Sequence, residues 1–334
     1  MKLHKTTLII SIILNLLVFA GCEQAEKTSK TNILKKTYKV AILLPSEMYL
    51  PLSAVGLKEG MQELGYREGK NIEYFIYNAK GNTTKLKALA REIVNSKPDV
   101  ICPSINNATE AVKETGTGLP VVFLESMYPV EFGLVKNLTE PGVNYTGVTN
   151  MTGPMSGKRL ELLVKMVPGI KRVALIYSPD NTVSRLSMET TKEAAAKLGL
   201  QLDIYPVYKL EDVDKAIVRV EASPVDAFVL NPDFMVFSRL PKIVAMAKRK
   251  KIPTMGIDHT QAEQGILASY GGGLKEIARQ AAGQVDRIIK GDSPAIIPIE
   301  PPRRYLLYIN MKTAKEIGVA IPEEILYQAA GYYR

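Results

Sequence analysis

Polar side chains that can bind or transform a small molecule stand directly after apolar runs in this chain. One such run covers residues 40–44, and polar residues follow it at once. A continuous apolar run is typical of a parallel strand buried on both faces, and open α/β sheets bind ligands at the carboxyl ends of their strands. We therefore expect the following residues to contact a ligand: Ser46, Glu47, Tyr49, Asn106, Asn107, Ser126, Tyr128, Asn181, Ser184, Asp233, Phe234 and Asp258.

The chemistry of these positions favours binding over catalysis. The chain has two histidines, and because His4 belongs to the amino-terminal segment, only His259 remains for a zinc cluster or a histidine-based triad. No Walker A motif occurs, and no G-x-G-x-x-G sequence follows a strand. A carboxylate pair such as Asp233 with Asp258 can act as acid and base, but at the mouth of a cleft it more often binds a cation or a ligand amine. We expect no catalytic residue, no cofactor and no metal.

Some of these residues also have structural interpretations, which the sequence leaves open. Asn106 and Asn107 suit the amino-terminal cap of a helix as well as a ligand contact. Tyr49 suits a half-buried position in a loop. Helix starts at this edge of a sheet offer free backbone N–H groups to an anionic group, whichever role the side chains take.

The strands and helices that must position these residues occur in two copies along the sequence. The first copy contains Lys39-Val-Ala-Ile-Leu-Leu, Glu63-Leu-Gly-Tyr, Lys97-Pro-Asp-Val-Ile and Leu119-Pro-Val-Val-Phe-Leu. The second contains Arg172-Val-Ala-Leu-Ile-Tyr, Lys197-Leu-Gly-Leu, Pro224-Val-Asp-Ala-Phe-Val-Leu and Ile252-Pro-Thr-Met-Gly-Ile. A repeat of this length is a whole domain of strands and helices, and residues 141–150 divide the two copies. We predict an α/β protein of two Rossmann-like lobes with parallel sheets, joined by a hinge.

The predicted lobes exchange their carboxyl-terminal segments. The amino-terminal lobe covers residues 38–148 plus about 272–298, and the carboxyl-terminal lobe covers 149–271 plus about 303–334. Three consecutive glycines at 271–273 suit a hinge because glycine adopts dihedral angles closed to other residues. The proline-rich residues 298–302 predict a further crossing. Three crossings permit a hinge motion and fix its axis.

The amino terminus has the marks of a secretion signal. Positive charge in residues 1–5 precedes an apolar run over about 8–19, which is short for a membrane-spanning helix. The segment ends Phe19-Ala-Gly-Cys22, which resembles the bacterial lipobox, so we predict a signal peptide over 1–22 and lipidation of Cys22. An ordinary cleaved signal with an incidental cysteine is the alternative. Residues 23–37 are polar and predict a flexible tether, while Cys102 stands in an apolar context and predicts a buried thiol.

The charge and composition of the chain limit the kinds of partner that we expect. The formal net charge is +9, but Lys and Arg alternate with Asp and Glu along most of the chain. The one dense basic run is 248–251, where we expect a helix to end in favourable contact with its dipole, and a phosphate site is the alternative. No nucleic-acid motif occurs, so we expect no nucleic-acid partner. The charge gives weak support for affinity to an anionic membrane surface.

Over residues 38–322 the chain resembles a family of ABC-transporter substrate-binding lipoproteins whose named members bind tryptophan or tyrosine. The matching residues are Gly56, Glu63-Leu-Gly-Tyr-x-Glu-Gly-Lys-Asn71, Lys97-Pro-Asp-Val-Ile101, Leu119-Pro-Val-Val-Phe123, Pro129-Val130, Asn144-x-Thr-Gly-Val148, Lys171-Arg-Val173, Lys197-Leu-Gly199, Ile252-Pro253 and Gly291. The resemblance implies the type I periplasmic binding protein fold. It also implies an ABC permease with its ATPase as partners, and we expect the chain itself to be a monomer.

Loop tips at the expected cleft depart from the family pattern. The exchanges are Asn106-Asn107 for Thr-Pro, Tyr128-Pro-Val for Asp-Pro-Val, Asn181-Thr-Val-Ser184 for Glu-x-Asn-Ser, and Asp233-Phe234 for Asp-Asn. Ser184, Asp233 and Asp258 are retained. Tyr128 and Phe234 are added aromatic residues that suit stacking on a flat ligand, each worth about 0.5–1.5 kcal/mol beyond area burial. The exchanges predict an altered choice of ligand.

The sequence therefore predicts a lipid-anchored, extracytoplasmic receptor that closes on a small ligand and presents it to a permease. A ligand that contacts both lobes only in the closed form shifts the equilibrium toward closure. Asp233 or Asp258 would accept a ligand ammonium group, and helix starts after Ser46 or Asn106 would receive a carboxylate. Two alternatives remain open: a sensory lipoprotein that signals to a membrane receptor, and a lipid-anchored enzyme.

Overall fold

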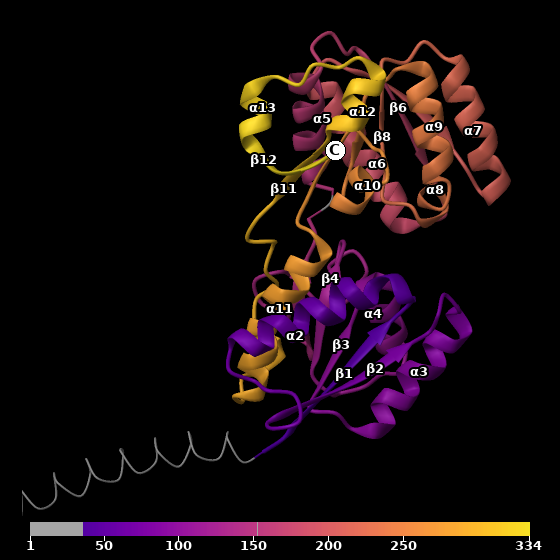
Figure 1. Cartoon of the computed structure of the whole chain (residues 1–334). Coiled ribbons are helices and arrows are strands. Elements are labelled where there is room, and N and C mark those ends of the chain that lie inside the picture. Colours follow the sequence, from indigo (N-terminus) through magenta and orange to yellow (C-terminus); the bar gives the residue numbers. More distant parts are fainter. Residues whose placement is uncertain (1–35, 152) are drawn as a thin grey trace, which may run out of the picture.

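Each half of the chain builds a sheet with helices on its faces, and the halves form two lobes (Figure 1). The first sheet is parallel, and the second is parallel except where β10 pairs with β11. The computed structural model describes residues 36–151 and 153–334. The predicted signal peptide, Cys22 and nearly all of the predicted tether lie outside these residues. The limits of the two lobes stay a prediction, and the α/β class with two mostly parallel sheets is confirmed.

The sheet of the first lobe has five parallel strands in the order β2-β1-β3-β4-β5. They are β1 (Tyr38–Leu44), β2 (Ile72–Asn78), β3 (Val100–Pro103), β4 (Val121–Ser126) and β5 (Tyr145–Thr149). The apolar run of β1 is fully buried from Val40 to Leu44, as its composition predicts. The helical segments are η1 (Glu47–Tyr49), η2 (Leu50–Ala54), α2 (Val55–Glu63), α3 (Thr83–Ser96) and α4 (Ile105–Lys113).

The sheet of the second lobe has the order β12-β11-β10-β9-β8-β6-β7. Its strands are β6 (Arg172–Tyr177), β7 (Gln201–Pro206), β8 (Ala227–Val229), β9 (Thr254–Gly256), β10 (Ala268–Gly271), β11 (Leu306–Asn310) and β12 (Ala329–Tyr333). Its helices are α5 (Met155–Met166), α6 (Thr182–Lys197), α7 (Leu210–Ala222), α8 (Phe234–Phe237), α9 (Leu240–Lys250), α10 (His259–Glu263), α12 (Met311–Ile317) and α13 (Glu323–Gln328). Read from β7 to β10, this order repeats that of the first lobe, so the sequence repeat is a structural repeat.

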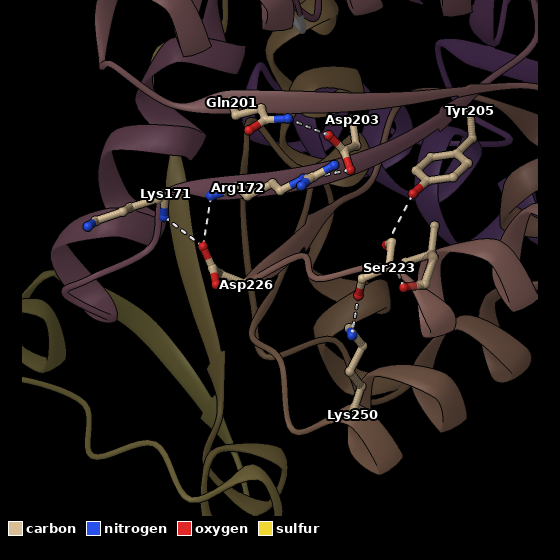
Figure 2. Close-up of polar contacts among 9 residues, drawn as sticks. Lys171, Arg172, Gln201, Asp203, Tyr205, Ser223, Asp226 and Lys250 are labelled. Atoms are coloured by element: carbon tan, nitrogen blue, oxygen red, sulfur yellow. Dashed lines mark hydrogen bonds and ion pairs between the residues drawn. The ribbon is translucent and has the colours of Figure 1, made fainter.

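The repeat extends to single side chains at the amino-terminal ends of the strands. In the first lobe Asp99 accepts a hydrogen bond from the Lys39 N–H at 2.8 Å. In the second lobe Asp226 accepts from the N–H groups of Lys171 and Arg172 at 2.9 and 2.8 Å (Figure 2). In each lobe an aspartate before the third strand thus fastens the start of the first strand. This edge is opposite to the one that holds the predicted site.

Helix α11 (Leu274–Ile289) returns the chain from the second lobe to the first, where it packs against α2 (Figure 1). The close approach requires glycine, because a Cβ atom at Gly56 or Gly60 would lie 2.3 Å from a backbone oxygen of α11. The chain then passes through η3 (Pro294–Ile296) and pairs with β5 before it crosses again to β11. Half of the dividing residues 141–150 form strand β5 of the first lobe, where the sequence predicted a connection between the lobes.

Two smaller expectations are confirmed. The basic run ends helix α9, and Lys248 and Arg249 are paired with Glu316 and Glu221 at 2.6 and 2.7 Å. Cys102 is fully buried in the core of the first lobe, and burial raises the pKa of its thiol. Throughout the described residues, no helix combines the length and the apolar character that crossing a membrane requires.

Candidate functional site

A cavity of about 800 Å³ lies between the carboxyl ends of the two sets of strands and is lined by both lobes. Its size is within the range of small-molecule sites, which is roughly 300–1,000 Å³. The apolar side chains that line it are Met48, Tyr49, Pro51, Leu52, Ile105, Met127, Phe132 and Leu274 on one side and Val183, Pro232, Phe234, Phe237, Leu240 and Ile257 on the other. A ligand in this space contacts both lobes at once.

Glu125, at the end of β4, is the buried carboxyl group that the first lobe contributes to the cavity. Its side chain is 2% exposed. Oε1 accepts a hydrogen bond from the Asn150 amide, while Oε2 has no partner among the described residues. Desolvation raises the pKa of Glu125 to about 8, against the opposing effect of the Asn150 hydrogen bond and with a further contribution from the charge of Asp258. Burial therefore favours the protonated form of Glu125.

Asp258, from the second lobe, is the ionised carboxylate of the site. It caps α10, and its Oδ1 accepts hydrogen bonds from the backbone N–H and the hydroxyl of Thr260 at 3.0 and 2.8 Å. Desolvation acts to raise the pKa of Asp258, but the interactions with His259 and Thr260 outweigh it and lower that pKa. Burial, followed by the charges of Glu125 and Asp258, raises the pKa of Tyr49. The side chains of Tyr49, Glu125 and Asp258 therefore face the same cavity and influence one another's ionisation.

Asp233 lines the cavity, but its carboxylate is already used by the second lobe. The side chain is 3% exposed. Oδ2 accepts from the Ser178 N–H at 2.9 Å, and Oδ1 accepts from the N–H groups of Met235 and Val236 at 2.9 and 3.2 Å. The role of ammonium acceptor that the sequence suggested is thus better suited to Asp258, because Asp233 holds the start of α8 in place.

The asparagines of the site mostly support their own loops. The Asn106 amide donates to the Met127 carbonyl and accepts from the Met127 N–H, both at 2.8 Å, so it holds the loop after β4 instead of capping α4. Asn181 caps α6 by accepting from the Ser184 N–H. Asn107 lines the cavity in the first turn of α4.

The start of α4 at the cavity differs from the starts of α6, α8 and α10, which have side-chain caps. Ser104 occupies its cap position, but the hydroxyl pairs with that of Ser53 at 2.6 Å, so no side chain of the described residues caps the helix. Ile105 follows with a φ of 55°, in the left-handed region that β-branched residues rarely adopt. Strained backbone of this kind is concentrated at functional sites.

One aromatic ring from each lobe meets at the cavity. Tyr49 is 5% exposed and Phe234 is 52% exposed, and their ring centroids are 6.5 Å apart. Tyr128, which the sequence predicted to stack on a flat ligand together with Phe234, lies outside the lining. Its hydroxyl instead lies 3.0 Å from the Ser187 hydroxyl of α6 and links the two lobes.

Of the twelve predicted residues, the structure brings seven to the lining: Tyr49, Asn106, Asn107, Asn181, Asp233, Phe234 and Asp258. The other five lie elsewhere. Glu47 is exposed and pairs with Lys80 at 3.6 Å. Ser126 and Ser184 are fully buried, and the Ser184 hydroxyl accepts from the Ser178 N–H and the Asn231 amide. Ser46 and Tyr128 are not part of the lining.

Sequence reasoning missed Glu125 and its partner Asn150. The available signal was the position of Glu125, a carboxylate directly after the apolar residues 121–124. A charged residue that continues a buried strand is almost never fully buried unless it is paired. Its orphaned oxygen is visible only in three dimensions.

Two lobes that enclose a cavity at facing strand ends define a solute-binding protein of the periplasmic type. The family described as ABC transporter substrate binding protein matches residues 39–332, and the chain belongs to this family. The tyrosine-binding protein of Clostridioides difficile (strain R20291) is 24% identical over 319 residues, which cover 94% of this chain and 92% of that protein.

Solved structures agree with this assignment. A conserved domain protein from Vibrio cholerae is 30% identical, with a TM-score of 0.80, and the match covers 89% of this chain and 100% of that one. An ABC domain from Streptococcus pneumonia in complex with L-Trp gives the same TM-score and coverage at 24% identity. At that identity the second structure supports the fold alone.

Proposed function

We propose that this protein is the extracytoplasmic, lipid-anchored solute-binding component of an ABC importer. It binds a small aromatic or amino-acid-like ligand in the cavity between the lobes. The observation that carries the proposal is the cavity of about 800 Å³, lined by aromatic rings and carboxyl groups from both lobes. The family membership and the name of the Clostridioides difficile relative support a transport role and an aromatic amino acid as the first ligand to test.

Closure of the lobes couples binding to delivery. Phe234 and Asp258 belong to one lobe and Tyr49 and Glu125 to the other, so a ligand between them gains its full set of contacts only when the lobes are near each other. Such a ligand stabilises the closed form by its extra affinity for that form. The closed form is the one presented to the permease and its ATPase, while Cys22 holds the protein at the membrane.

A thermal-shift screen over amino acids, nucleosides and small aromatic compounds tests the binding role. A ligand at 100 times its dissociation constant adds roughly 2.7 kcal/mol to the free energy of unfolding, so a true ligand gives a clear shift. Deletion of the gene that encodes this protein should then abolish uptake of that ligand. If no compound binds and no uptake depends on the protein, the proposal is wrong.

The anchor is tested separately by Cys22→Ser. We expect the unmodified protein in the membrane fraction and the variant in the soluble extracytoplasmic fraction, with identical ligand binding. Retention of the variant at the membrane would contradict lipidation at Cys22.

A further inference from the structure

We propose that the cavity selects small organic cations, which carry an apolar or aromatic body and a positively charged nitrogen held between Glu125 and Asp258. This inference rests on the proposed solute-binding function and names the class of solute. It predicts that a cation is preferred over a zwitterionic or anionic compound with the same body.

The charges around the cavity are of one sign. Five residues with carboxyl groups line it, namely Glu110, Glu125, Asp233, Asp258 and Glu263. No lysine or arginine of the described residues lines it. A cleft lined by charges of one sign raises the local concentration of the opposite ion and attracts it during association. An anionic group on a ligand finds no cationic side chain there.

Glu125 supplies a carboxyl oxygen that lacks a hydrogen-bond partner. It is 2% exposed, it lines the cavity, and its Oε2 has no hydrogen-bond partner in the part of the chain that the structure describes. A buried carboxyl oxygen without a partner is unfavourable in either protonation state, and a hydrogen bond from a charged donor to a carboxylate is stronger than one from a neutral donor. An ammonium or amidinium N–H in the cavity satisfies this oxygen.

Asp258 supplies the second contact from the opposite lobe. Two carboxylates that face one space repel each other when both are ionised, and the charge of Asp258 acts on Glu125 in this way. A cationic nitrogen between them favours the ionised form of Glu125 and then attracts both carboxylates. The cation therefore favours the approach of the lobes, whereas an uncharged ligand leaves the protonated form of Glu125 favoured and gains no such attraction.

The apolar lining accommodates the body of such a cation. Tyr49 and Phe234 bring one ring each from the two lobes, and aromatic faces also attract organic cations directly. Two kinds of solute share this chemistry: simple amines with an aromatic body, and basic amino acids with an aliphatic stem. The uncapped first turn of α4 is the place where a carboxylate of the second kind would bind.

Isothermal titration calorimetry with matched pairs of probes tests the inference. Tyramine, tyrosine and 3-(4-hydroxyphenyl)propionate share one body and carry a positive, a zwitterionic and a negative charge, respectively. Lysine and norleucine differ in the terminal ammonium group. We expect the cationic member of at least one set to bind at least tenfold more tightly than its partners, and the set that responds identifies the kind of solute.

Two variants test whether Glu125 and Asp258 cause the preference for a cationic probe. We expect Glu125→Gln and Asp258→Asn each to weaken binding of the cationic probe at least tenfold. Asparagine caps a helix as well as aspartate does, so the second variant keeps α10 intact. Glu92→Gln is the matched control, because Glu92 is exposed on α3, outside the cavity lining. Circular dichroism and thermal unfolding establish that each variant is folded.

Three results would overturn the inference. The first is equal or tighter binding of the zwitterionic or anionic member in both sets. The second is an unchanged affinity for the cation in both folded variants. The third is a lack of binding by every cationic probe, and if an uncharged solute from the thermal-shift screen then binds, the inference fails while the proposed solute-binding function stands.

Discussion

The two lobes present different polar groups to the same cavity. In the second lobe three of the helices that start at the cavity are capped by their own residues: Asn181 caps α6, Asp233 caps α8 and Asp258 caps α10. In the first lobe α4 has no side-chain cap among the described residues, and Oε2 of Glu125 has no partner there. The second lobe is thus largely complete without a ligand, whereas the first holds groups that a ligand completes. Substitutions in the two lobes should separate stability from binding.

The largest effect is expected for Asp233→Ala, because it removes the acceptor of three backbone N–H groups in a buried position. Hydrogen bonds to charged groups are worth about 1.5–3 kcal/mol each and are not additive, so we expect a loss of roughly 4 kcal/mol in the free energy of unfolding. Urea denaturation measures it. Asp180→Ala, an exposed aspartate in the preceding loop, is the matched control and should change stability little. A loss below about 1 kcal/mol would show that Asp233 is available to a ligand after all.

Glu125→Gln should have the opposite effect, and one that depends on pH. Folding raises the pKa of Glu125 from its usual value to about 8, because the buried site disfavours the charged form. The folded protein therefore binds more protons than the unfolded chain between those values, and its stability falls as the pH rises through that range. Glutamine does not ionise, so the variant escapes this loss and should be more stable than the wild type at pH 8 by roughly 3 kcal/mol.

The comparison of the two pH profiles isolates this carboxyl group. At pH 4 Glu125 is largely protonated in both the folded and the unfolded state, so the wild type and the variant should be nearly equal in stability. The groups that act on Glu125 are Asn150 and Asp258, and both remain in the variant. Parallel profiles between pH 4 and 8 would show that Glu125 is not held in its protonated form.

Phe234→Ala should affect ligand binding much more than the stability of the second lobe. Because Phe234 is 52% exposed, its loss should change the free energy of unfolding by less than about 0.5 kcal/mol. Its loss should weaken an aromatic ligand by about 1 kcal/mol, which is roughly fivefold in affinity. Calorimetry with the ligand found in the screen measures this. Tyr208→Ala, at a position 63% exposed and outside the cavity lining, should leave affinity unchanged.

The fold was largely predictable because it depends on patterns that the sequence repeats. The buried runs of β1 and β6, and the aspartates at 99 and 226, carry the same signal in both halves. Strand β5 was missed because its polar threonines and glycine hide a fully buried strand between turns. The short β10 and β12 were missed because their pairing with β9 and β11 depends on distant partners.

The site was predictable only in part, for a physical reason. Position at a strand end selects residues near the cavity, but it does not tell which atoms are already bonded. Asp233 and Ser184 look like ligand contacts in the sequence, yet they bond to backbone or side-chain groups of their own lobe. Glu125 follows an apolar run and gives little signal, although its orphaned oxygen is the group most in need of a ligand.

The smallest effect is expected where the lobes touch outside the cavity. The Tyr128 hydroxyl lies 3.0 Å from the Ser187 hydroxyl, and the two residues belong to opposite lobes. Tyr128→Phe removes this hydrogen bond while each lobe keeps its own core. A net hydrogen bond is worth about 0.5–1.5 kcal/mol, so the closed arrangement should weaken by that amount and ligand affinity should fall by roughly two- to tenfold. Ser187→Ala should give the same fall, and the double variant should add nothing further, because one interaction is removed only once. Calorimetry on the four proteins completes the cycle, and additive losses would show that Tyr128 acts on the ligand by another route than the contact between the lobes.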